Sequence, residues 1–162
     1  MAKYAENTSV TSAVSRDEIE RTLVRFGASQ FMYGWRENMA IIAFSANGKQ
    51  IRFILPMPDR NSPEIIKTPE RGRIRSKEQQ EKAYEQAIRQ KWRALAVTIK
   101  AKFAAVEAGI SVFEREFFYD IVLPNGQTVG EYVMPQLEES YQTGTMPSML
   151  PMLGDGLRDG KV

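Results

Sequence analysis

The sequence contains no cysteine and no histidine among its 162 residues. Without cysteine the chain has no disulfide, no thiolate nucleophile and no zinc–thiolate site, a composition typical of a reducing compartment. Without histidine it lacks the side chain that most often serves as a general acid or base near neutral pH and as a ligand of transition metals. These two absences exclude most common catalytic chemistry.

Long apolar runs and a large net charge are also missing. A membrane-spanning helix needs roughly 20 consecutive apolar residues, and the N-terminus is polar where a signal peptide is apolar. We therefore expect a cytoplasmic protein that does not enter a membrane. The 22 basic and 20 acidic residues leave a formal net charge of +2. Nucleic-acid binding would require local segregation of charge, because the overall charge is mild.

Familiar catalytic motifs are absent as well. The sequence has no phosphate-binding Gly-x-x-x-x-Gly-Lys-Ser/Thr loop, no Gly-x-Ser-x-Gly elbow, no dinucleotide fingerprint and no calcium loop. A magnesium site could be built from carboxylates, but their spacing shows no metal-ligand pattern. The carboxylates in question are Asp59, Glu64, Glu70, Glu114, Glu116 and Asp120. We predict a protein without enzymatic activity, cofactor or metal.

The stretch from Ser76 to Gly109 is the strongest structural signal in the chain. Ser76 and Gln79 have the spacing of a capping box, and Gly109 suits the left-handed residue that ends a helix. Apolar side chains recur between them at helical spacing and form one stripe. The stripe consists of Tyr84, Ile88, Trp92, Leu95, Ile99, Phe103 and Val106. We expect one long helix with this stripe buried, since aromatic residues at core periodicity are more often core than base-stacking platforms.

The chain before this helix predicts a short helix and a sheet. Residues 1–14 are small and polar and predict a flexible arm. Ser15 and Glu18 form a second capping-box pattern, so a helix from roughly Arg16 to Phe26 should follow.

From Gln30 to Leu55 the apolar period changes to two, with Asn47-Gly48 as a type I′ hairpin signal. That turn sets Phe44 opposite Ile51 and Ile42 opposite Phe53. If Glu37-Asn38 forms the earlier turn, Tyr33 faces Ile42 and Phe31 faces Phe44. Both registers place the same apolar residues on one face, which predicts a three-stranded antiparallel meander with both helices on that face. The face comprises Phe31, Tyr33, Trp35, Ile42, Phe44, Ile51, Phe53 and Leu55.

The opposite sheet face is mixed in character, with Met32, Ile41 and Ile54 beside Arg36 and Arg52. Two interpretations remain open at this point. The C-terminal segment or a second subunit could cover this face, or it could bind an extended ligand.

A loop rich in proline and arginine separates the sheet from the long helix. Residues 56–75 contain four prolines, a density that argues against a helix or a central strand and predicts an extended loop. Its second half concentrates positive charge with Glu70 as the one acid, and arginines around Gly72 suit phosphate contacts. These cations are Lys67, Arg71, Arg73, Arg75 and Lys77.

The long helix adds a basic margin to its apolar stripe. Arg89, Arg93 and Lys100 share one ridge and have no acidic partner in the pattern of their own helix. A solvated helix edge and an anion-binding surface are both consistent with this ridge. For nucleic-acid binding we select the loop residues Lys67, Arg71, Arg73 and Arg75, the ridge residues Arg89, Arg93 and Lys100, and Arg36 and Arg52 from the sheet.

The C-terminal third predicts shorter elements. Ser111 and Glu114 again have capping-box spacing before a helix through 112–119, Pro124-Asn125-Gly126 predicts a turn, and 135–141 a last short helix. Residues 144–162 are rich in methionine, proline and glycine and predict a disordered tail. The fold class is therefore α+β in the order α-β-β-β-α-α, as one domain over 15–143 with a basic loop at 56–76.

Part of this chain resembles a known group of proteins. The run from Ala83 to Phe118, which contains AYEQAIRQKWRALAVTIKAKFAAVEAGISVFEREF, precedes IVLPNGQTVGEY and a TGTMPSMLP ending. Together they resemble small uncharacterised proteins encoded in tailed-phage and prophage genomes, which implies the cytoplasm of a bacterial host. The predicted element order is also similar to that of double-stranded RNA-binding domains and of single-strand annealing proteins, an analogy of topology that does not fix function.

We therefore expect a non-catalytic nucleic-acid-binding protein that binds or anneals single-stranded DNA in phage replication or recombination. Self-association is compatible with the sequence. The alternative is a protein-interaction module, a phage factor that binds or inhibits a host complex through the mixed sheet face or the tail at 145–162.

Overall fold

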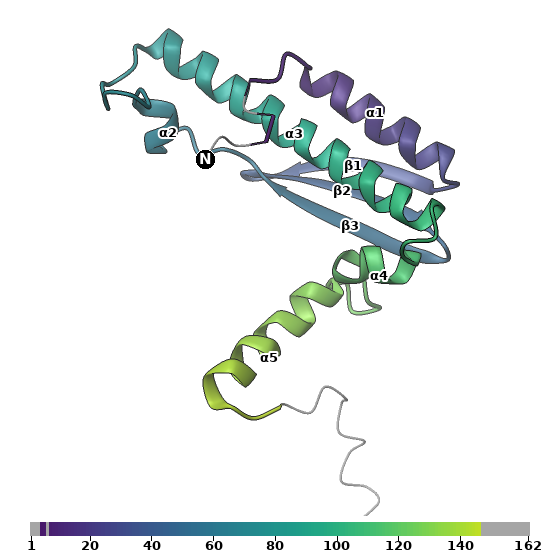
Figure 1. The fold of residues 1–162 in the computed structure, drawn as a ribbon. Coiled ribbons are helices and arrows are strands. Elements are labelled where there is room, and N and C mark those ends of the chain that lie inside the picture. The colour runs from purple at the N-terminus through teal and green to yellow at the C-terminus, as the bar shows by residue number, and fades with distance from the viewer. Residues whose placement is uncertain (1–3, 6, 147–162) are drawn as a thin grey trace, which may run out of the picture.

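A computed structural model of the protein describes residues 4–5 and 7–146, so the predicted tail lies almost wholly outside the described residues. Three antiparallel strands in the order β1-β2-β3 form one sheet, and the two long helices α1 and α3 lie side by side on one face of it (Figure 1). This is the α+β order expected from the sequence. The elements are α1 (Ser12–Arg25), β1 (Ser29–Arg36), β2 (Met39–Ala46), β3 (Lys49–Pro56), α2 (Pro63–Ile66), α3 (Lys77–Glu107), α4 (Phe113–Phe117), η1 (Phe118–Asp120) and α5 (Val129–Thr143).

Helix α3 confirms the signal that dominates the sequence. Ser76 and Gln79 form the predicted capping box, and Gly109 takes a positive φ of 68° just beyond the last turn. Trp92 and Ile99 are buried against the sheet, as are Leu95 and Phe103. No helix in the described part of the chain is long and apolar enough to cross a membrane.

Helix α1 begins earlier than the sequence suggested. Its cap is Thr11, whose side chain accepts a hydrogen bond from the Val14 N–H, and the helix runs from Ser12 to Arg25. The prediction that Ser15 caps the helix is wrong, because Ser15 lies inside the first turns and is fully buried. Thr11 is also a good capping residue. With Thr11 as the cap, α1 gains one turn at its start, and the helix packs against α3.

The predicted sheet register is largely confirmed. Phe44 pairs with Ile51, Ile42 pairs with Phe53, and Tyr33 lies opposite Ile42. The register of β1 shifts between Ser29 and Met32, so the expected pairing of Phe31 with Phe44 is not formed. Gln30, in the shifted segment, has a positive φ of 55°, which is typical of the extra residue in a β-bulge.

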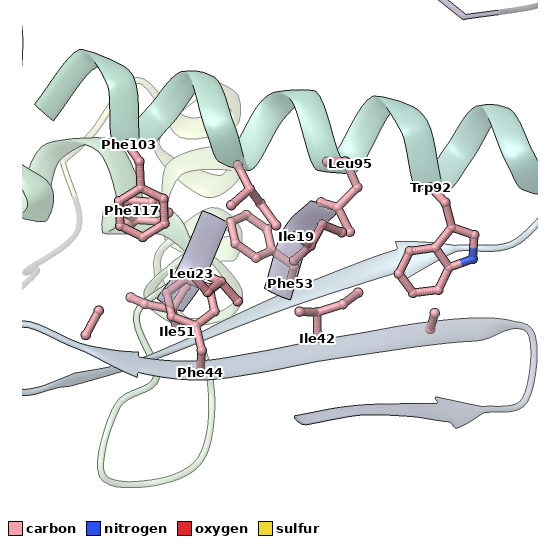
Figure 2. Packing of buried hydrophobic residues seen from close by; sticks show 14 of the residues in the cluster. Ile19, Leu23, Ile42, Phe44, Ile51, Phe53, Trp92, Leu95, Phe103 and Phe117 are labelled. Carbon is pink, nitrogen blue, oxygen red and sulfur yellow. The ribbon is translucent and has the colours of Figure 1, made fainter. Parts of the chain in front are cut away.

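An aromatic cluster joins α3, the sheet and α4 (Figure 2). Phe103 lies at its centre, with its ring centroid 4.6 Å from that of Phe26 and 4.9 Å from that of Phe117. Phe44 of β2 and Phe113 of α4 complete the contacts at 6.2 and 6.3 Å. The core therefore ties the C-terminal end of α3 to elements from the whole described chain.

Two C-terminal expectations need correction. Helix α4 begins after Val112 with no side-chain cap, so Ser111 does not form the predicted capping box. Helix α5 begins at Val129, six residues before the predicted start at Pro135, because Thr128 and Glu131 form a capping box that the sequence analysis missed. Proline is most common in the first turn of a helix, but Pro135 lies in the interior of α5.

The start of α5 is held firmly against the edge of the sheet. The predicted turn at 124–126 closes a small hairpin in which Val122 bridges Thr128, and the Val122 N–H donates to the Gln50 carbonyl at 2.8 Å. Gly130 is buried under Tyr119, and a Cβ at this position would lie 2.3 Å from the ring. Only glycine allows this close approach.

Asp120 should make the folded protein less stable as the pH rises. Burial raises its pKa from the ordinary 3.8 to about 6, and the Lys102 charge offsets part of the rise. A raised folded-state pKa gives stability that is complete below 3.8 and is lost as the pH rises through about 6. This rise in pKa corresponds to at most about 3 kcal/mol of folding stability, and solvent screening of this partly exposed group should reduce the contribution to about 1–2 kcal/mol.

The substitution Asp120→Asn should therefore remove this loss. We expect the unfolding free energy of the wild type, measured relative to that of the variant, to fall between about pH 4 and 6. Urea unfolding at several pH values measures both. The exposed Asp17→Asn on α1 is the matched control and should keep the wild-type slope; an Asp120→Asn variant with that same slope would contradict the assignment.

Candidate nucleic-acid interface

The basic loop folds into a small ordered hairpin over residues 67–75, which we call the arginine hairpin. The Thr68 N–H donates to the Arg73 carbonyl at 2.8 Å, and the Gly72 N–H donates to the Thr68 carbonyl at 3.0 Å. Lys67 and Ile74 form an isolated β-bridge below this tip. Gly72 has a φ of 58°, a backbone conformation that other residues adopt rarely. The turn therefore holds its side chains on a defined backbone.

The prediction of an extended loop without helix is wrong for part of this region. Besides the hairpin, Pro63 starts the four-residue helix α2, where its fixed φ and missing N–H are compatible with the first helical position. Ile65 of α2 is buried, and α2 packs against α3. The segment therefore places a short helix on α3 immediately before the hairpin.

Arg75 fastens the base of the arginine hairpin. Its guanidinium donates to the backbone carbonyls of Glu64 at 2.6 Å and Ile65 at 3.2 Å, at the end of α2. Its own carbonyl accepts a hydrogen bond from the Gln80 side chain at 2.8 Å. Because these contacts use the guanidinium for local structure, Arg75 is less suited to phosphate binding than its neighbours.

Lys67, Arg71 and Arg73 are the exposed cations of the hairpin. None of the three forms an ion pair or side-chain hydrogen bond with another described residue. Arg71 and Arg73 line a shallow hollow of about 380 Å³ together with Thr68, Pro69 and Glu70. Lys77, the first residue of α3, is also exposed close by in the chain. These side chains can turn toward an anion without breaking an existing interaction.

Arg60 supports this end of the molecule and was not selected from the sequence. Its guanidinium forms an ion pair with Glu81 and lies 3.8 Å from the centroid of the Tyr84 ring. The hydrogen bond from Arg60 lowers the pKa of Glu81. Arg60 and Glu81 are 21 positions apart in the sequence, and no pattern in the chain reveals this contact.

The basic ridge of α3 is largely neutralised. Arg89 pairs with Glu85 one turn earlier at 3.5 Å, so the expectation that it has no partner on its own helix is wrong. Arg93 forms an ion pair with Glu18 of α1, and the Lys100 ammonium lies 3.6 Å from the same carboxylate. Phosphates would have to compete with carboxylates already in place.

The two predicted sheet cations lie on the face away from α1 and α3. Arg52 pairs with Glu131 of α5 at 2.8 Å. Arg36 lines a hollow of about 500 Å³ with Arg52 and has no carboxylate partner among the residues that the structure describes. The nine predicted residues therefore divide into three groups on the hairpin, on α3 and on the open sheet face.

The aromatic residues divide between core and surface. Trp92 is buried, whereas Tyr33 and Trp35 on the edge strand β1 are 50% and 55% exposed. Trp35 meets Trp92 edge to face at 6.0 Å, and the Arg16 guanidinium lies 5.5 Å from the Tyr33 ring centroid. This edge offers two aromatic side chains to solvent in an arrangement that packing holds in place.

The six carboxylates weighed for magnesium do not come together. Glu114 pairs with Lys49 at 2.9 Å, and within residues 4–5 and 7–146 no group of three acidic side chains could hold a metal ion.

Comparisons of the chain with protein-family models, with curated proteins and with solved structures found no match.

Proposed function

We propose that the protein binds single-stranded DNA without catalysis and that the arginine hairpin is its principal phosphate-binding element. The observation that carries this proposal is the set of three exposed cations, Lys67, Arg71 and Arg73, on an ordered turn without a carboxylate partner among the described residues. Arginine suits phosphate because its planar guanidinium donates two parallel hydrogen bonds to one phosphate group.

The choice of a single strand rests on the exposed aromatic edge. Bases of an unpaired strand stack on aromatic side chains, and Tyr33 and Trp35 are half exposed on β1. A duplex would bury its bases and gain nothing from these rings. The neutralised ridge on α3 favours a short footprint centred on the hairpin instead of a long basic track. A role in phage replication or recombination follows only from the resemblance noted above.

Gel-shift measurements on a single-stranded oligonucleotide at two salt concentrations test this function. Each phosphate contact on a single strand contributes about 0.7 to the slope of log affinity against log salt. Three contacts give a slope of about 2, so raising salt from 50 to 200 mM should weaken binding about 20-fold. Absence of any shift at low ionic strength would exclude this function.

A second candidate function, interaction with another protein, is favoured by a different observation. Helix α5 exposes Leu137 and Tyr141 at 42% and 85%, more apolar surface than a solvated helix needs. A pull-down that recovers a specific partner after nuclease treatment, and that fails when Leu137 is replaced by Asp, would support it. An empty pull-down after nuclease would remove this alternative.

A further inference from the structure

The sheet face opposite α1 and α3 forms an apolar groove. Two hollows, of about 500 and 320 Å³, share Ile41 and Arg52 and so continue into one another along the strands. Met32 and Ile54 on this face are 66% and 42% exposed. We call this surface the sheet groove. Helices α1 and α3 both lie on the other side of the sheet, as Figure 1 shows. Within the described chain, the first turn of α5 lines one end of the groove through Glu131, and no other helix is among the residues that line it.

Helix α5 carries an apolar stripe that its own chain covers only at the start. Gly130 in the first turn packs under Tyr119 of η1. Leu137 and Tyr141 lie seven and eleven residues further on, hence on the same side of the helix. They are 42% and 85% exposed, because α5 projects away from the sheet (Figure 1). The side of α5 that is buried at Gly130 is therefore exposed to solvent further along the helix, at Leu137 and Tyr141.

The charges of the helix and the groove are complementary. Helix α5 contains Glu131, Glu138 and Glu139 and no lysine or arginine. The sheet groove contains Arg36 and Arg52, and the carboxylate that lines it belongs to α5 itself, since Glu131 pairs with Arg52. Arg36 keeps its charge without a carboxylate partner in the described part of the chain. An acidic amphipathic helix is therefore the occupant that fits both the floor and the rim.

The helix and the groove also agree in length. A helix of 15 residues is about 22 Å long, and a strand of eight residues is about 27 Å long. A protomer cannot fold α5 onto its own groove, because the hairpin at 121–128 and the contact of Gly130 with Tyr119 set the start and direction of the helix. The α5 of another copy has no such constraint.

We propose that the sheet groove binds helix α5 of a second copy of this chain in a reciprocal, two-fold symmetric dimer. Each protomer would bury the exposed stripe of its partner and place acidic residues near Arg36. Because helix and groove occur on every copy, one symmetry operation satisfies both contacts, as isologous interfaces require. This proposal does not depend on DNA binding.

Sedimentation equilibrium of the full chain tests the dimer. At micromolar concentrations and above, we expect twice the 18.4 kDa chain mass. Leu137→Asp on the stripe and Ile54→Asp in the groove should each raise the dissociation constant about tenfold or more, since a carboxylate is costly to bury in an apolar contact. Gln142→Asp adds the same charge to α5 on a side turned away from the stripe, and it should leave the dimer intact.

Mixing the two defective variants gives the sharper result. A mixed dimer of Leu137→Asp and Ile54→Asp protomers retains one intact contact, the normal α5 of one protomer in the normal groove of the other. The mixture should therefore dimerise more strongly than either variant alone. Circular dichroism and thermal unfolding establish that both variants are folded, as expected for substitutions at exposed positions.

Three outcomes would overturn the proposal. The full chain could remain monomeric at all concentrations, as expected if the groove is covered within the chain or reserved for a different protein. The dimer could survive Leu137→Asp and Ile54→Asp, which would place its interface elsewhere. The mixture could fail to exceed the separate variants, which would exclude reciprocal exchange.

Discussion

Replacing Lys67, Arg71 and Arg73 together by alanine should weaken binding to single-stranded DNA about 100-fold at 0.1 M salt. Each phosphate contact contributes about 0.7 to the slope of log affinity against log salt, so three contacts contribute about 2. Because 0.1 M is one logarithmic unit below 1 M, losing these contacts lowers the affinity at 0.1 M by about two logarithmic units. The slope itself should fall by about 2. Fluorescence anisotropy with a labelled oligonucleotide measures both quantities over a series of salt concentrations.

A matched variant separates local contacts from overall charge. Replacing Arg21, Arg25 and Arg115 by alanine removes the same three charges from exposed positions on α1 and α4. Both triple variants change the formal net charge from +2 to −1. The control should lose only a few-fold in affinity. Equal losses in the two variants would show that attraction is diffuse and that the arginine hairpin is not a site.

Arg75 is left out of the hairpin variant for a structural reason. Its guanidinium binds two carbonyls at the end of α2, so its loss would alter the backbone that positions Arg71 and Arg73. A variant that includes Arg75 would confuse a missing phosphate contact with a loosened hairpin. The three retained substitutions should change the unfolding free energy by less than about 1 kcal/mol, because exposed side chains without partners contribute little to stability.

Replacing Phe103 by alanine should destabilise the protein by about 3–5 kcal/mol. The ring contacts four other phenylalanines from α1, β2, α4 and their flanking segments, at centroid distances of 4.6 to 6.3 Å. Its removal leaves a cavity between α3, the sheet and α4. Urea unfolding should show a lower midpoint, and the melting temperature should fall by about 10 °C or more.

Phe118→Ala is the matched control for this substitution. Phe118 is also a phenylalanine near the same cluster, but it is 57% exposed at the start of η1. Its replacement should cost less than about 1 kcal/mol. A similar loss in the two variants would contradict the view that Phe103 centres the core.

The parts of the fold that were predictable depend on local chemistry. The alternation from Tyr33 to Leu55 and the Asn47-Gly48 turn fix the register, because a slip by one residue would move every apolar side chain to the other face. The capping box at Ser76 and the positive φ at Gly109 are likewise properties of a few neighbouring residues. Where one local preference had no competitor, the sequence was sufficient.

The capping pattern failed where a second preference competed. Ser15 and Ser111 have an acidic residue three positions later, as a capping box requires, yet neither caps a helix. Helix α1 begins earlier, with Thr11 as its cap, and Ser15 is buried inside it. Helix α4 follows Val112, which provides no side-chain cap. Such choices are decided by tertiary packing, which a local motif does not contain.

The candidate site was only partly predictable because its ion pairs are long-range. The ridge on α3 is visible in the sequence, but its neutralisation by Glu18 depends on the face that α1 turns toward α3, 75 residues away in the chain. The compact hairpin depends on a contact between Arg75 and α2 that no spacing encodes. The exposed trio of Lys67, Arg71 and Arg73 remains a prediction supported by its freedom from such pairs.

Amide chemical-shift mapping of the ¹⁵N-labelled full chain during titration with a single-stranded oligonucleotide tests the central claim most directly. We expect the largest shifts at 67–77, with Arg71 and Arg73 most affected, and smaller shifts near Tyr33 and Trp35 on β1. These shifts should vanish as salt is raised. Shifts confined to the sheet groove or α5, or no shifts at low ionic strength, would contradict it.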